Sequence, residues 1–237
     1  NCGLVGQNAC VEVDGSAYWM SENGFFRYAG KLESLPCLVE DFVYDDINLT
    51  SGNQMVSAGL NNLFGEVMWF YPTSSSSVVN KMVAYNYFDS SPQRPVWTVG
   101  TLARTMWRDS AVFGKPHATL YDADTDTSFD VVGNTEGITT YYEHEIGTDQ
   151  NKNGTITAIT ANISSGDFDI TQARAQGTGQ STGLATFRGD GEFLMKIRRF
   201  VPDFISQTGS TRVTLQLKNY PNSTQASSPL GPFDVTA

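Results

Sequence analysis

Two aromatic segments that meet at an Asn-Gly pair constrain this chain more than any other feature. Residues 18–30 read Tyr-Trp-Met-Ser-Glu-Asn-Gly-Phe-Phe-Arg-Tyr-Ala-Gly. Aromatic residues favour strands, and Asn-Gly favours a tight turn because both residues tolerate positive φ. The segment therefore predicts an antiparallel hairpin with its turn at Asn23-Gly24. A second turn at Asp14-Gly15 extends the prediction to three strands, at residues 9–13, 17–20 and 24–28.

Segments of the same kind recur further along the chain. Three strands are expected between residues 65 and 102, around Trp69, Tyr85 and Trp97. A third group, from His117 to Gly147, predicts strands at 118–122, 128–132 and 139–146. Between the first two groups, we expect a short helix or an irregular segment over residues 41–58. The groups recur about every 40–50 residues, which is the spacing of β-propeller blades.

The pattern changes after residue 146. A polar turn region at 147–155 is followed by predicted strands within 156–170, 193–205, 211–220 and 231–236. In residues 211–220 the apolar side chains alternate, with Val213, Leu215 and Leu217 on one face, which is typical of a half-buried antiparallel strand. The sequence thus predicts an all-β chain. Residues 1–155 would form part of a β-propeller with antiparallel blades, and residues 156–237 an incomplete β-sandwich-like domain.

Composition excludes several classes of protein. With 15 basic and 25 acidic residues, the formal charge is −10, which argues against a general nucleic-acid-binding surface. No apolar run approaches the roughly 20 residues that a membrane-spanning helix needs. Cys2, Cys10 and Cys37 are odd in number and form no CxxC motif, so we expect three buried thiols and no disulfide scaffold.

Metal and cofactor sites are not predicted. The acidic segments 122–130 and 149–154 resemble calcium loops, but both lack the glutamate that a helix–loop–helix site carries at its twelfth position. We interpret them as solvated hairpin turns. His144-Glu145 begins like a zinc protease motif without its second histidine, and His117 is the chain's other histidine.

Catalytic residues are not predicted either, although one enzymatic alternative stays open. Propellers often carry a pair of carboxylates for glycoside hydrolysis. Candidates for such a pair are Glu143, Glu145, Asp41, Asp45 and Asp46. In a chain with 25 acidic residues, a chance pair is common. We therefore expect a protein without enzymatic activity.

The residues of greatest interest are aromatic and basic. We expect the aromatic side chains to form blade cores and contacts between blades, and these are Trp19, Phe25, Phe26, Trp69, Trp97 and Trp107. Arg198 and Arg199 are either surface ion-pair residues of little energetic weight or part of a subunit contact. The second interpretation follows from the enrichment of Arg and aromatic residues in interface hot spots.

Several of these motifs together resemble tail hub or nozzle proteins of short-tailed bacteriophages, the podovirus tail tubular family. The segments that carry the likeness span nearly the whole chain, and they are residues 18–26, 35–37, 68–72, 85–87, 96–100, 103–107, 142–147, 165–170 and 199–203. The resemblance implies a propeller combined with sandwich-like parts, and a homo-hexameric ring around a DNA channel. It implies no catalytic residue, cofactor or metal.

The same resemblance implies partners and a location. The ring would lie below the portal and adaptor, contact other tail proteins such as a fibre, spike or needle, and pass genomic DNA without reading its sequence. The protein would be made in the host bacterial cytoplasm and reside in the virion tail. Because about three blades cannot close a propeller, the chain is expected to belong to a longer polypeptide. The alternatives are a glycan-binding or glycan-hydrolysing propeller of a phage tail, and a secreted adhesion module.

Overall fold

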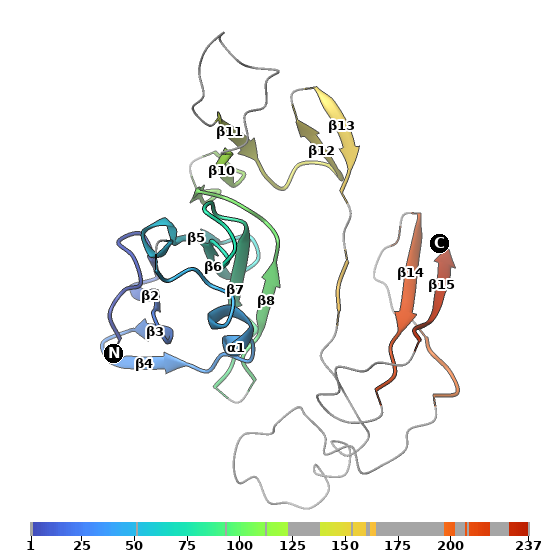
Figure 1. Ribbon diagram of the computed structural model, residues 1–237, viewed down its shortest axis with the longest axis horizontal. Helices are drawn as coiled ribbons and strands as arrows, with labels where there is room; N and C mark the ends of the chain where they lie inside the picture. The colour runs from blue at the N-terminus through green and yellow to red at the C-terminus, as the bar shows by residue number, and fades with distance from the viewer. Residues whose placement is uncertain are drawn as a thin grey trace, which may run out of the picture. The chain divides into compact units, whose positions relative to one another are not determined.

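The computed structural model describes residues 2–50, 52–92, 94–111, 113–122, 138–152, 154–159, 162–164, 197–201, 207, 209–218 and 228–236 (Figure 1). Over these residues the chain is almost entirely β, as the sequence predicts, with one short α-helix and every paired strand antiparallel to its neighbour. The chain divides into two compact units, Asn1–Ile159 and Thr160–Ala237. No helix in this part of the chain is long and apolar enough to cross a membrane.

The first sheet is a four-stranded meander with the order β1-β2-β3-β4. Its strands are β1 (Cys10–Val13), β2 (Ser16–Ser21), β3 (Gly24–Tyr28) and β4 (Leu32–Leu35). The first three strands confirm the prediction, whereas β4 was not predicted. Its sequence, Leu-Glu-Ser-Leu, contains no aromatic or β-branched residue, so strand propensity does not reveal it.

The two turns of this sheet differ in their backbone conformation. Asp14 and Gly15 both have positive φ, 47° and 76°, which is the conformation that a two-residue hairpin turn of type I′ requires. In the next hairpin Ser21 pairs with Gly24, so the turn lies one residue earlier than predicted. Its central residues are Glu22 and Asn23. Gly24 has positive φ but already belongs to β3.

A short α-helix, α1 (Glu40–Tyr44), and a 3-10 turn (Asn53–Met55) join the first sheet to the second, in the region where a short helix or an irregular segment was expected. The second sheet has the order β5-β6-β7-β8. Its strands are β5 (Ser57–Asn61), β6 (Glu66–Tyr71), β7 (Lys81–Asn86) and β8 (Trp97–Gly100). The last three confirm the prediction, whereas β5 was not predicted.

The third sheet has three strands, in the order β11-β10-β9. These are β9 (Met106–Arg108), β10 (His117–Asp122) and β11 (Ile138–Glu143). The predicted strand at 128–132 lies outside the described residues. The prediction for β11 extends three residues too far, because residues 144–146 leave the sheet.

A separate hairpin follows, formed by β12 (Asp149–Lys152) and β13 (Thr155–Ala158). The polar segment 149–154, expected to be a turn throughout, is therefore half strand. The turn itself is present at its end, where Gly154 has a φ of 82° and its N–H is accepted by Asn151 Oδ1 at 2.9 Å. The domain boundary expected at residue 155 falls inside this hairpin. Along the chain, the first compact unit ends at Ile159.

In the second unit the described residues form one antiparallel pair, β14 (Ser210–Leu215) with β15 (Leu230–Thr236). Burial alternates along β14 as predicted, but the register shifts between Val213 and Leu215, and the strand ends there. Residues 197–201, part of a predicted strand, are irregular. The described residues of the second unit thus show one two-stranded sheet, and the sandwich-like domain expected from the sequence stays a prediction.

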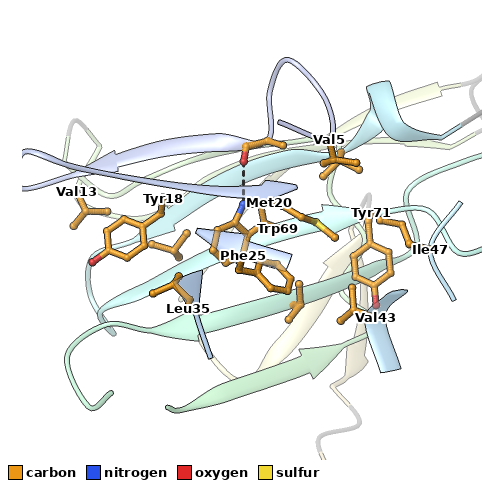
Figure 2. Packing of buried hydrophobic residues seen from close by; sticks show 14 residues of the cluster. Val5, Val13, Tyr18, Met20, Phe25, Leu35, Val43, Ile47, Trp69 and Tyr71 are labelled. Atoms are coloured by element: carbon orange, nitrogen blue, oxygen red, sulfur yellow. Dashed lines mark hydrogen bonds between the residues drawn. The ribbon is translucent and has the colours of Figure 1, made fainter. Parts of the chain in front are cut away.

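Two apolar clusters connect the sheets of the first unit. The larger lies between the first and second sheets, and Figure 2 shows Phe25 and Trp69 at its centre. The smaller lies between the second and third sheets and contains Met68, Phe70 and Trp107. Successive side chains of a strand point to opposite faces, so β6 contributes to both clusters. This explains its continuous apolar sequence, since a strand covered on both faces does not alternate.

The cysteines correct a prediction made from composition. Cys2 and Cys10 are exposed, and Cys37 is of intermediate exposure. All three are free thiols. Burial raises the pKa of the Cys37 thiol to about 12. The exposure arises because Cys10 lies on the outer face of the first sheet, beside Trp19, and Cys2 lies in the irregular segment that precedes the sheet.

Candidate functional site

The aromatic junctions between successive sheets are the best-defined constellation in the described structure. At the first junction the Phe25 ring lies 4.9 Å from the Trp69 ring and 4.7 Å from the Trp97 ring, measured between centroids. Phe25 and Trp69 are completely buried. Phe25 comes from β3 of the first sheet, whereas Trp69 and Trp97 come from β6 and β8 of the second. Tilted ring pairs at this separation contribute about 0.5–1.5 kcal/mol each beyond their area burial.

Each of the four tryptophans also donates its indole N–H to a backbone carbonyl elsewhere in the chain. Trp69 donates to Ala9 at 3.1 Å, and Trp97 donates to Pro36 at 2.8 Å. Both bonds run from the second sheet to segments that flank the first. A tryptophan whose polar nitrogen is satisfied in this way combines a large apolar surface with a directional bond, which fixes how the sheets are aligned.

The second junction is built around Trp107 of β9. Its ring stacks on Phe70 of β6 with 5.9 Å between centroids, and its indole N–H is donated to the Leu60 carbonyl at 2.9 Å. Gly59 makes this approach feasible, because a Cβ at that position would lie 2.7 Å from Trp107 Cβ. A glycine inside a strand often marks such a close contact, so Gly59 was recognisable in principle.

Trp19 and Phe26 occupy the outer face of the first sheet, away from this core. They are cross-strand partners, and their rings stack at 5.8 Å. The Trp19 indole N–H is donated to the Cys2 carbonyl at 2.7 Å, which holds the N-terminal segment on that face. Both side chains are partly exposed. Phe26 therefore points away from Phe25, its neighbour in the sequence, because strand side chains alternate between faces.

The helix α1 holds the β2–β3 turn through Tyr44. Its hydroxyl lies 2.8 Å from the Ser21 carbonyl oxygen and 3.0 Å from the Gly24 carbonyl oxygen, within donating distance of both. Burial raises the pKa of Tyr44 above its ordinary value, so the phenol keeps its proton. The aromatic hairpin is therefore fixed by a segment about 20 residues further along the chain, a contact that no local pattern predicts.

A polar cluster lies beside Trp107 on the inner face of the third sheet. Arg104 Nε donates to His144 Nε2 at 2.9 Å, and the guanidinium lies over the Tyr142 ring, 4.2 Å from its centroid. Because Nε2 accepts this bond, His144 is a neutral imidazole with its proton on Nδ1. Burial lowers the pKa of His144 to about 4, and the positive charge of Arg104 adds to the effect. His144 is therefore a structural acceptor at neutral pH.

The opposite face of the third sheet carries the other histidine. The Tyr141 hydroxyl bonds His117 Nδ1, and the two rings stack at 5.4 Å between centroids. Phe113 meets the His117 ring edge-on at 4.8 Å. Tyr141 and Phe113 are themselves exposed, 63% and 58%. His117 thus lies on the outer face of the third sheet, whereas His144 follows β11 and packs beside Trp107 on the inner side.

The remaining residues singled out from the sequence are dispersed. Arg198 and Arg199 are exposed and lie in the irregular part of the second unit. Of the carboxylates considered for glycoside hydrolysis, Glu143 ends β11 and Glu145 follows it. The others lie in α1 or directly after it, and they are Asp41, Asp45 and Asp46. Asp46 is engaged in a part-buried ion pair with Lys81.

Comparison with known proteins adds no family to this description. No family model matches the chain, and a search of curated proteins gives no significant match. Within the described residues there is also no group of three or more His, Cys, Asp or Glu side chains placed to hold a metal ion. The geometry of the sheet junctions is consequently the main structural basis for a functional argument.

Proposed function

We propose that this chain is a structural protein of a phage virion. In this proposal it belongs to a hexameric tail nozzle or hub that lies below the portal and adaptor and forms a channel for genome ejection. The observation that carries the proposal is the stacking of three successive antiparallel sheets through aromatic junctions, each joined by tryptophan indole bonds. The order of aromatic motifs, similar to that of tail nozzle proteins, supports it.

The first two sheets have the strand number and order of propeller blades. A blade is a four-stranded antiparallel meander that packs face to face on its neighbours. Both sheets are meanders of this kind, and an apolar cluster fills the space between them. We interpret residues 1–155 as blades of a partial propeller, with the third sheet as a further blade. The pair β14–β15 would belong to the sandwich-like domain.

A structural role without enzymatic activity fits the charge of the chain. The formal charge of −10 repels DNA phosphates, so an acidic channel wall would let genomic DNA pass without sequence-specific binding. The exposed Arg198 and Arg199 are proposed contacts between subunits of the ring. Its other partners would be the adaptor or portal and a fibre, spike or needle protein. The location would be the virion tail, after synthesis in the host bacterial cytoplasm.

Electron microscopy of the purified chain and of phage particles labelled with an antibody against it tests this proposal. We expect a sixfold ring and labelling at the tail. The double variant Arg198→Glu/Arg199→Glu should weaken ring formation, whereas Arg94→Glu, a change at another exposed arginine, should not. A monomeric protein that is absent from virions would contradict the proposal. Hydrolysis of host glycans by the purified protein would instead favour the alternative, a glycan-processing tail protein.

A further inference from the structure

The three main sheets of the first unit are stacked in sequence order, and they approach one another most closely through their first strands. β1 contacts β5, and β5 contacts β9. The Ala58 backbone N–H of β5 is donated to the Asn8 carbonyl, just before β1, at 2.7 Å. Apolar clusters cover both faces of the second sheet. Within the described residues, the first and third sheets are each packed on one face only, so the stack has two open ends.

The outer face of the first sheet is mainly apolar. The strand register places Trp19 opposite Phe26, and Tyr28 opposite Leu32, on this face. Tyr28 and Leu32 are 51% and 46% exposed, and Trp19 and Phe26 are partly exposed. Glu12 of β1 is exposed on the same face. Contiguous exposed apolar side chains that have a polar rim are typical of protein interaction surfaces.

The outer face of the third sheet has a similar composition. Because Trp107 points toward the second sheet, its neighbours Met106 and Arg108 point outward. Met106 is 65% exposed, and Tyr121 and Tyr141 are exposed on the same face. Aromatic residues, Met and Arg are the residue types enriched at protein interfaces. Both open ends of the stack therefore have the composition of a contact surface.

The two outer faces carry opposite charges on their first strands. Glu12 lies on β1 and Arg108 on β9, and neither belongs to an ion pair among the described residues. β1 and β9 both run in the direction of β5, since successive residues of the neighbouring strands meet in the same order. Glu12 and Arg108 follow the middle of their strands, so they lie toward the same end of the stack. Glu143, the other charge of the third sheet's outer face, lies on the far strand β11.

We propose that the outer face of the third sheet in one copy of this chain packs on the outer face of the first sheet in a second copy. This contact continues the stack that the chain already forms, with β9 of one copy beside β1 of the next. The same order of strands then brings Arg108 to the side where Glu12 lies, and opposite charges favour this register.

A contact between two different faces is heterologous, and repeated contacts of this kind close into a ring when the rotation allows it. The contact would therefore join subunits of the ring proposed above. The inference itself rests on the sheets of the first unit, and it does not depend on a role in a phage tail.

Sedimentation velocity of the full chain at concentrations up to about 100 μM tests the contact. We expect the wild type to assemble. Leu32→Glu and Met106→Glu should each weaken association at least about 10-fold, because each would bury an unpaired charge in the contact. Leu63→Glu is the matched control, because Leu63 is 49% exposed but lies in the β5–β6 turn, outside both faces. Near-UV circular dichroism verifies that the variants are folded.

Mixing two variants tests whether the contact joins different faces. Leu32→Glu keeps an intact third sheet and Met106→Glu an intact first sheet, so the equimolar mixture should form a heterodimer and nothing larger. A contact between identical faces would not give this result. Arg108→Glu should also weaken association, and adding Glu12→Arg to it should restore association. A mixture that stays monomeric would overturn the proposal.

Other outcomes separate this proposal from the proposed function. A monomeric wild type, or Leu32→Glu and Met106→Glu variants that assemble like the wild type, would overturn the sheet contact. If only Arg198→Glu/Arg199→Glu abolished assembly, the proposed ring would stand without this contact. Assembly that requires both outer faces, in a protein absent from virions, would support the contact and contradict the phage role.

Discussion

Trp69 of β6 donates its indole N–H to the backbone carbonyl of Ala9, 60 residues earlier in the chain, at 3.1 Å. The same carbonyl accepts the Met20 backbone N–H at 3.1 Å, so one oxygen joins the first and second sheets. Both Trp69 and Ala9 are completely buried. A bond of this kind specifies the alignment of two packed sheets, which apolar contacts alone leave free to slide.

Replacing Trp69 by phenylalanine should destabilise the first unit moderately. The variant retains most of the apolar volume but loses the bond to Ala9, whose carbonyl keeps Met20 as a donor. We expect a loss of about 1–3 kcal/mol in the free energy of unfolding, measured by urea denaturation. Trp69→Ala should cost more, about 3–5 kcal/mol, because it also leaves a cavity. Equal stability of wild type and Trp69→Phe would show that the indole bond is dispensable.

Gly59→Ala should destabilise the second junction. The added methyl group would lie 2.7 Å from Trp107 Cβ, and the ring cannot withdraw without losing its contacts with Leu60 and Phe70. We expect a cost of about 1–3 kcal/mol from overpacking, measured by thermal or urea unfolding. Gly100→Ala is a matched control in β8, because its nearest contact would be an ordinary 3.6 Å to Met82. Similar behaviour of the two variants would contradict the packing at Trp107.

His144 should make stability depend on pH. Its pKa is lowered to about 4 in the folded chain, compared with about 6.5 when unfolded. As the pH falls, the unfolded chain therefore binds this proton first, and stability decreases between about pH 6.5 and about pH 4. Above that window the residue contributes no pH dependence. The difference between unfolding profiles of wild type and His144→Gln isolates the effect, and NMR titration of the imidazole gives the midpoint. A midpoint above pH 6 would refute the neutral acceptor role.

Alkylation should distinguish the three cysteines. Partial burial disfavours the Cys37 thiolate and raises the pKa of this thiol to about 12. The thiolate is the reactive form, so at pH 8 Cys37 should react with iodoacetamide at least about 10-fold more slowly than Cys2, which is exposed. Mass spectrometry of peptides after timed labelling measures both rates. Labelling of Cys37 as fast as Cys2 would show that the segment after β4 opens readily.

Local sequence patterns predicted many of the strands but missed short strands and strands without aromatic residues. The aromatic segments around Trp19, Trp69 and Tyr85 all form antiparallel strands, because bulky side chains suit a pleated surface whatever lies opposite. The strands β4 and β5 were missed, since neither has an aromatic residue. The strand β9 was missed although it contains Trp107, because three residues are too short for a recognisable pattern. β4 and β5 form because a neighbouring strand supplies their hydrogen bonds, and β5 also has one buried face.

The pairing of Asn61 with Glu66 across the β5–β6 hairpin could not be predicted from the sequence. Asn61 and Glu66 are only five residues apart, yet their pairing depends on the register of a hairpin whose first strand the pattern did not reveal.

The sequence by itself determined the all-β character of the described chain and the turn at Asp14-Gly15, because strand and turn preferences are set by each residue and its immediate neighbours. Only the tertiary structure decided which aromatic residues meet. Phe25 and Phe26 are adjacent and chemically identical, yet one is buried against Trp69 and the other stacks on Trp19 at the outer face. The physical reason is that alternation fixes two opposite faces, whereas the packing of a second sheet selects which face becomes the core.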